Sequence, residues 1–160
     1  MGQLLLHEDN IVVGLDARNH EDALKKIVDA LPAWSLQGIE KEKILQLLIL
    51  RERIGTTAIG HGIALPHCFS PEVHEPIMAF GVSPAGIPFP SLDARPVHFI
   101  FILILPQNET AEFQKRKILQ NIKWFLCDRS MQERLKRAYT ASEIHQLIVP
   151  EAQQVPALGV

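Results

Sequence analysis

The run VHFIFILILP, from Val97 to Pro106, constrains the fold more than any other part of the sequence. Most of its residues are aromatic or branched aliphatic, and they do not alternate with polar ones. Such a run is typical of a central strand that is covered by other elements on both faces. A membrane-spanning helix needs roughly 20 apolar residues, about twice this length, so we expect no direct membrane insertion.

Helical spacing of apolar residues predicts two helices before this strand. The first lies within residues 17–32, with Asn19 as its N-cap and one buried stripe. The second lies within residues 40–53; it is polar at its start, strongly apolar later, and ends before Gly55. The stripe of the first helix consists of Ala23, Leu24, Ile27, Val28 and Leu31.

Further elements are expected on both sides of the central strand. A second strand is predicted over residues 76–83, with a turn over residues 83–96. Helices are predicted over residues 110–126 and 131–138. The inward face of the longer of these two helices is predicted to consist of Phe113, Ile118, Leu119, Ile122 and Phe125.

The last predicted helix begins at Thr140, which has the spacing of a capping box with Glu143. Helices and strands therefore alternate along the chain, and no long linker divides it. This pattern predicts a single α/β domain over residues 1–150, followed by a flexible tail over residues 151–160.

Charge and cysteine content narrow the functional class. The net charge is −2, so no basic excess indicates a nucleic-acid or anionic-membrane partner. His7, Glu8 and Asp9 interrupt the N-terminal apolar residues too early for a secretory signal. The two cysteines, Cys68 and Cys127, suit a reducing compartment. We expect a cytoplasmic protein, and no feature of the sequence calls for a cofactor.

The stretch ERIGTTAIGHGIALPHC, residues 52–68, combines groups that can hold and accept a phosphoryl group. Its glycines let backbone N–H groups approach an anion, and its threonine hydroxyls add donors. Arg51 precedes it with a forked guanidinium, and His67 supplies a partly neutral, nucleophilic ring. These groups predict a site for phosphohistidine chemistry. The glycines and threonines are Gly55, Thr56, Thr57, Gly60 and Gly62.

Structural alternatives stand beside these roles. Arg51 also complements the C-terminal end of the helix that carries it. Thr56 and Thr57 can equally satisfy the backbone of a turn.

Residues 51–67, RERIGTTAIGHGIALPH, resemble the signature of the mannitol/fructose-type enzyme IIA domains of the bacterial phosphotransferase system, most closely its nitrogen-regulatory branch. That family shows Arg-Glu, then Gly-Ser/Thr-Thr, then Gly-x-Gly-Ile-Ala-Ile-Pro-His, and this sequence matches nearly every position. The resemblance extends over about residues 5–148. It implies a mixed β-sheet flanked by helices on both sides.

The resemblance also assigns roles to individual residues. It implies that His67 accepts a phosphoryl group from HPr or a nitrogen-branch phosphocarrier, which makes the protein a phosphotransferase. Arg51 matches an arginine beside that histidine, and Thr57 matches the threonine of the preceding loop. Family members commonly carry a second histidine, whose position falls on Lys115 here. A lysine can neutralise phosphate charge as a point charge, although its QKRK surroundings also suit a solvated face.

Two more positions depart from the family pattern. His61 stands where the family often has asparagine, and it is either a substitute donor near the site or a solvated loop residue. His98 stands where the family often has aspartate, and the sequence does not explain that change.

Three functions are compatible with the sequence and with the family resemblance. The first is a regulatory phosphoprotein that docks on kinases, transporters or transcription regulators. The second is a sugar-transport enzyme IIA that passes the phosphoryl group to an enzyme IIB. The third is a binding module that is not phosphorylated. No fused IIB or membrane segment is visible in the sequence, which favours regulation.

Two other kinds of site, a zinc site and a cysteine nucleophile, fit the sequence less well. His61, His67, Cys68 and His74 could all ligate zinc, but they lack the short paired spacings of closed zinc sites, so we expect no metal. Cys68 could be a nucleophile, but adjacent strand residues point in opposite directions, so His67 is poorly placed to activate it.

Overall fold

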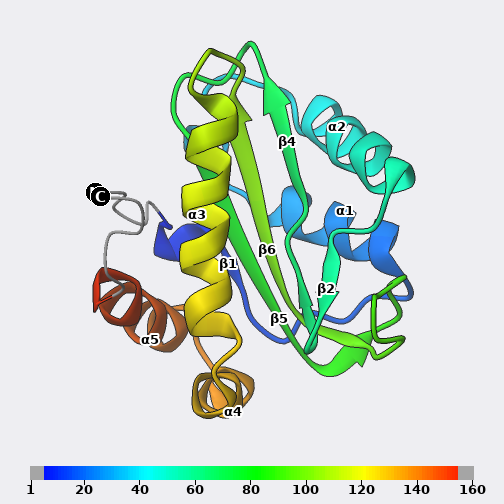
Figure 1. Cartoon of the computed structure of the whole chain (residues 1–160), viewed down its shortest axis with the longest axis vertical. Coiled ribbons are helices and arrows are strands. Elements are labelled where there is room, and N and C mark those ends of the chain that lie inside the picture. Colours follow the sequence, from blue (N-terminus) through cyan, green and yellow to red (C-terminus); the bar gives the residue numbers. More distant parts are fainter. Residues whose placement is uncertain (1–5, 155–160) are drawn as a thin grey trace.

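The computed structural model describes residues 6–154 and consists of a six-stranded sheet with helices on both faces (Figure 1). On one face lie α1 (His20–Ala30) and α2 (Lys41–Ile54). On the other lie α3 (Ala111–Leu126), α4 (Arg129–Arg137) and α5 (Ala141–Gln154). Two short 3₁₀ helices, η1 (Glu8–Asn10) and η2 (Ala33–Leu36), complete the helical elements of the described residues.

The sheet mixes parallel and antiparallel pairs in the order β1-β5-β6-β3-β2, with β4 also paired to β6. On one edge β6 pairs with the antiparallel β5, and on the other it pairs in succession with the parallel strands β3 and β4. The predicted central strand and the mixed sheet between helical layers are thereby confirmed. The strands are β1 (Ile11–Val12), β2 (Ala58–Gly60), β3 (Ile63–Ala64), β4 (His67–Ser70), β5 (Ile77–Ile87) and β6 (Val97–Pro106).

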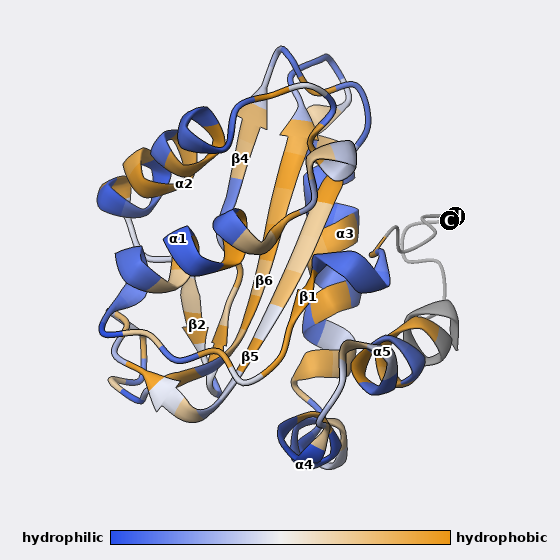
Figure 2. Cartoon of the chain, turned by 180° about the vertical axis from the view of Figure 1, so that it is seen from behind, coloured by the Kyte–Doolittle hydropathy of each residue, from blue (hydrophilic) through white to orange (hydrophobic). Residues whose placement is uncertain are grey.

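The two faces of β6 belong to two separate hydrophobic cores. Ile100, Ile102 and Ile104 pack toward the predicted stripe of α1 and toward α2. The alternate residues, including Phe99 and Phe101, pack toward α3, α4 and α5. Figure 2 shows β6 as a continuous hydrophobic strand inside the sheet. Burial on both faces explains why this strand shows no alternation of apolar and polar residues.

The strand β5 is longer than the sequence indicated. It continues to Ile87, so the first part of the predicted turn over residues 83–96 is wrong. The pairing with β6 shifts register between Val82 and Ile87, where Ile87 pairs with Val97. Ile87 and Val97 are both fully buried, and this irregularity lets the strand pass Pro84 and pair again beyond it.

Phe113 does not belong to the inward face of α3, contrary to the prediction. Its side chain is 62% exposed, and the ammonium group of Lys117 lies 5.0 Å from its ring centroid. Phe113 precedes the fully buried Ile122 by nine residues, or about two and a half helical turns, so the two side chains point in opposite directions. Ile118 and Leu119 are partly buried against the core, as predicted.

The predicted helix starts are confirmed in detail. The side chain of Asn19 accepts a hydrogen bond from the backbone N–H of Asp22 at 2.9 Å. The hydroxyl oxygen of Thr140 accepts one from the backbone N–H of Glu143 at 3.1 Å, and the Glu143 carboxylate reaches back to the N–H of Tyr139. The threonine half of the capping box therefore forms, and the glutamate half goes to the residue before Thr140.

The C-terminal helix passes the predicted domain boundary. α5 continues to Gln154, so the first residues of the predicted tail are helical, and residues 155–160 lie outside the described part of the chain. Within residues 6–154 we find no helix with the length and apolar character needed to span a membrane.

Candidate functional site

The segment that leads to His67 forms three short strands rather than one loop. β2 and β3 pair as a hairpin whose turn residues, His61 and Gly62, have positive φ angles of 57° and 76°. Two successive positive φ angles are typical of a type I′ hairpin turn. β3 begins with Ile63 opposite Phe99, whereas β4 begins with His67 opposite Leu103. Four residues along a strand span about 13 Å, so the hairpin turn lies well away from His67.

The predicted glycine-rich cradle is therefore wrong in its second half. Gly60, His61 and Gly62 belong to the hairpin end and do not surround His67. The backbone N–H of His61 donates instead to the carboxylate of Asp93 at 3.0 Å. Gly60 has a φ of 92°, and a Cβ atom there would come within 3.2 Å of Oδ2 of Asp93. The positive φ, together with the close approach of a carboxylate from the chain itself, thus favours glycine at Gly60.

Between β3 and β4 the residues Leu65 and Pro66 interrupt the strand ladder along β6. The N–H of Leu65 donates to the carbonyl of Thr57, and the N–H of Leu103 donates to the carbonyl of Pro66. β4 then resumes with His67, whose side chain is partly buried, and Cys68, whose side chain is buried. Cys68 packs into the core of the α1 and α2 face, so the neighbouring His67 side chain points to the opposite face.

One ring nitrogen of His67 is engaged by the chain. Its Nδ1 lies 2.8 Å from the carbonyl oxygen of Leu65. A carbonyl oxygen only accepts hydrogen bonds, so Nδ1 carries the hydrogen and the lone pair of the neutral ring lies on Nε2. Burial lowers the pKa of His67, and the charges of Arg51 and Lys115 lower it further against the opposing effects of Leu65 and Glu52. The ring is therefore held in its neutral, nucleophilic form.

Arg51 and Lys115 reach the histidine from different elements. Arg51 comes from the last turn of α2, where its guanidinium donates to the carbonyl of Gly55 at 2.9 Å. Lys115 comes from α3; its ammonium group forms a 2.8 Å ion pair with Glu112 and lies 5.7 Å from the ring centroid of Phe69. Only 22% of the Lys115 side chain is exposed, which argues against a merely solvated role. Arg51 and Lys115 both lie near enough to His67 for their charges to act on its ring.

The threonine hydroxyls are used inside the protein rather than aimed at a ligand. The hydroxyl of Thr57 donates to Oε2 of Glu52 at 2.6 Å, and its backbone N–H donates to Oε1 at 2.9 Å. The hydroxyl of Thr56 is hydrogen-bonded to Oε1 of Glu52 and to the carbonyl of Pro90. Each hydroxyl has one hydrogen, and it is directed at an acceptor of the chain. The structural alternative, in which the two threonines satisfy groups of the chain itself, is therefore realised in this structure.

Glu52 is the residue of the site that sequence reasoning missed. Its side chain is buried and joins the end of α2 to both threonines. The sequence pattern does indicate that Glu52 is buried, because Glu52 continues the buried stripe of Leu45 and Leu48 at helical spacing. A carboxylate in a buried stripe needs hydrogen-bond donors, and the two following threonines supply them.

The structure also bears on the cysteine-nucleophile and zinc interpretations of this segment. Burial raises the pKa of the Cys68 thiol to about 12, so it is not a thiolate near neutral pH. Among the side chains that the structure describes, those of residues 6–149, His, Cys, Asp and Glu nowhere gather in a group of three or more that could hold a metal ion.

Comparison with known proteins places the chain in a family. The family described as "Phosphoenolpyruvate-dependent sugar phosphotransferase system, EIIA 2" matches residues 4–150. A nitrogen regulatory protein of Pseudomonas aeruginosa is 31% identical over 138 residues, which cover 86% of this chain and 88% of that protein.

Two solved structures share the fold. The nitrogen regulatory protein IIA-Ntr of Neisseria meningitidis matches with a TM-score of 0.80 and 24% identity, covering 90% of this chain and 96% of that one. The mannitol enzyme IIA of Escherichia coli, solved in complex with phosphorylated enzyme IIB, matches with a TM-score of 0.71 and 22% identity, covering 91% and 97%.

Proposed function

This chain belongs to the EIIA 2 family of the phosphoenolpyruvate-dependent sugar phosphotransferase system, a family of phosphoryl carriers, and we propose that it accepts a phosphoryl group on Nε2 of His67 and acts as a regulatory phosphoprotein. The observation that carries the proposal is the 2.8 Å contact between Nδ1 of His67 and the carbonyl of Leu65. This contact leaves Nε2 as the nucleophilic nitrogen. Similarity to nitrogen regulatory proteins supports the regulatory role.

The proposed reaction is a transfer between two imidazole rings. The lone pair of Nε2 attacks the phosphorus of a phosphohistidine on the donor, and a new P–N bond forms as the old one breaks. The electron pair of the broken bond stays with the donor nitrogen, and the donor ring, which carries a hydrogen on its other nitrogen, leaves as a neutral imidazole. Leu65 keeps the hydrogen on Nδ1 throughout, while Arg51 and Lys115 offset the negative charge of the phosphoryl group.

HPr or a nitrogen-branch phosphocarrier is the proposed donor, since the family takes its phosphoryl groups from such carriers. Incubation with phosphoenolpyruvate, enzyme I and either carrier tests the proposal directly. We expect an acid-labile phosphate on the protein that disappears in His67→Ala and persists in His61→Ala, the matched control from the hairpin turn. Labelling of His67→Ala would contradict the assignment.

The regulatory part rests on charge. A phosphoryl group adds about −1.5 to −2 charge at neutral pH to a surface that carries Arg51, Lys115 and Glu112. A kinase, transporter or other partner that docks over His67 then distinguishes the two states. Pull-downs with wild type, His67→Asp and His67→Ala test this idea, and a partner captured equally by all three would count against it.

Onward transfer to an enzyme IIB is the second candidate function. The likeness to the mannitol enzyme IIA that was solved with its phosphorylated enzyme IIB favours it. The phosphorylated protein, freed of its donor, should then lose its label to a purified enzyme IIB. Retention of the label with every enzyme IIB of the source organism would leave regulation as the function.

A further inference from the structure

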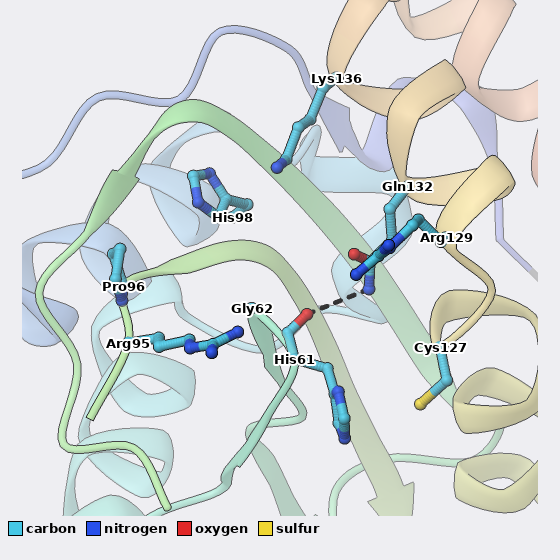
Figure 3. A pocket seen from close by; sticks show the side chains of 9 residues that line it. All are labelled: His61, Gly62, Arg95, Pro96, His98, Cys127, Arg129, Gln132 and Lys136. Carbon is cyan, nitrogen blue, oxygen red and sulfur yellow. Dashed lines mark hydrogen bonds between the residues drawn. The ribbon is translucent and has the colours of Figure 1, made fainter. Parts of the chain in front are cut away.

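The hairpin end of the sheet, away from His67, carries a cavity of about 350 Å³ (Figure 3). This volume falls at the lower end of the roughly 300–1,000 Å³ range of small-molecule sites. The cavity lies between the β2–β3 turn, the start of β6 and helix α4. Its lining comprises His61, Gly62, Arg95, Pro96, His98, Cys127, Arg129, Gln132 and Lys136.

The lining is cationic. Arg95, Arg129 and Lys136 carry positive charges, and none of the nine lining residues is an acid. Arg129, Gln132 and Lys136 are spaced by three and four residues along α4, so they form one face of that helix. In Figure 3 the charged ends of Lys136 and Arg129 extend from α4 toward the space that Arg95 enters from the opposite wall.

The carboxylate of Asp93, which contacts the backbone of two lining residues, is already engaged. It accepts hydrogen bonds from the backbone N–H groups of His61 and Arg95 and from the hydroxyl of Ser91. These bonds lower the pKa of Asp93, so it is ionised and partly offsets the charge of Arg95. Arg129 and Lys136 on the facing helix carry two further positive charges, which leaves the cavity with a net attraction for anions.

The side chains of Gln132 and His98 fix the shape of the cavity. The side-chain amide of Gln132 donates to the carbonyls of His61 at 3.0 Å and Leu126 at 2.7 Å, which ties α4 to the hairpin turn. Nδ1 of His98 lies 2.9 Å from the carbonyl of Ser83, and this contact fixes the ring at the start of β6. The walls are therefore held in place before any ligand binds.

We propose that this cavity is a second anion site, distinct from His67, that binds a small phosphorylated metabolite. A phosphate group matches the forked guanidinium groups of Arg95 and Arg129 and the point charge of Lys136. The small volume favours a compact organic phosphate over a polymer such as nucleic acid. A bound phosphate also relieves the mutual repulsion of the three cations.

Calorimetric titration of the full chain with inorganic phosphate, pyrophosphate and glycerol phosphate, at constant ionic strength set with chloride, tests the site. We expect saturable binding of at least one probe, weakened about tenfold or more in Arg129→Gln and in Lys136→Gln. Amide resonances of the Gln132 side chain should shift on binding. His67→Ala should bind as wild type does, so failure of the phosphotransfer proposal would not affect this result.

Lys25→Gln is the matched control, because it removes one positive charge from α1 on the other face of the sheet. If Lys25→Gln weakened the binding of the probes equally, the loss of affinity would be explained by net charge alone, and the proposal would be overturned. Absence of saturable binding by all three probes would overturn it as well. Binding of a short single-stranded oligonucleotide without binding of the phosphates would replace the metabolite with a nucleic acid.

Discussion

The carbonyl oxygen of Leu65 lies 2.8 Å from Nδ1 of His67, two residues further along the chain, and this contact sets the tautomer of the proposed nucleophile. It predicts that phosphorylation occurs on Nε2. Nitrogen-15 NMR of the phosphorylated protein, in which the phosphorus couples to one ring nitrogen, identifies the modified atom. A phosphoryl group on Nδ1 would show that the Leu65 contact does not govern the reaction.

The pH dependence of phosphorylation follows from the lowered pKa of His67. The neutral ring is the nucleophile, and burial together with Arg51 and Lys115 keeps the ring neutral to lower pH than usual. We expect the labelling rate to be level from about pH 8 to pH 7 and to fall only below about pH 6.5, the ordinary pKa of histidine. A rate that already falls between pH 8 and 7 would contradict the lowered pKa.

Removal of the Lys115 charge should raise the pKa of His67. In Lys115→Gln the ring loses one of the two cations that oppose its protonation, so NMR titration should show the pKa moving upward. Phosphoryl acceptance should also slow, because the positive charge beside the incoming phosphate is gone. Lys117→Gln is the matched control on the same helix, since Lys117 lies over the exposed ring of Phe113. Equal shifts in both variants would indicate only a general charge effect.

Truncation of Glu52 should destabilise the fold. Glu52→Ala leaves the buried backbone N–H and hydroxyl of Thr57 without their acceptor, which costs about 2–4 kcal/mol in the free energy of unfolding. Urea denaturation measures this loss. Glu52→Gln keeps one acceptor oxygen and should recover part of the stability. An unchanged midpoint in Glu52→Ala would show that water replaces the carboxylate.

Two glycines of the same motif should respond differently to alanine. Gly60→Ala places a Cβ at a φ of 92° and 3.2 Å from the Asp93 carboxylate, so we expect a loss of about 1–3 kcal/mol. Gly55 has an extended backbone with a φ of 179° and no atom within 4 Å of the added Cβ. Gly55→Ala should therefore be close to neutral. Thermal or urea unfolding of the two variants measures their free energies of unfolding. Equal losses in both variants would refute this distinction.

The larger elements of the fold could be predicted because their sequence patterns are local. The apolar run of β6 and the stripe of α1 each extend over a whole element. Burial of β6 on two faces produces a continuous apolar run, and burial of α1 on one face produces a stripe at helical spacing. Asn19 and Thr140 mark their helix starts by side-chain chemistry that acts within a few residues.

The short strands could not be predicted in the same way, and neither could the separation of the hairpin turn from His67. β2, β3 and β4 are two to four residues long, too short for periodicity, and β3 and β4 form only because β6 offers them a long-range partner. For this reason Gly60 and His67 seemed to share one loop. The acceptors of the Thr56 and Thr57 hydroxyls likewise depend on where α2 ends in space, although burial of Glu52 was readable from helical spacing.

The interruption at Leu65 and Pro66 makes the length of this segment as critical as its chemistry. Side chains alternate along β4, so inserting or deleting a single residue between β3 and β4 would exchange the directions of His67 and Cys68. The thiol would then face Lys115 and the imidazole would enter the core beneath α2. A variant of that kind would keep every reactive residue of the motif, but it would present the sulfur of Cys68 instead of the ring nitrogen of His67 to the donor protein.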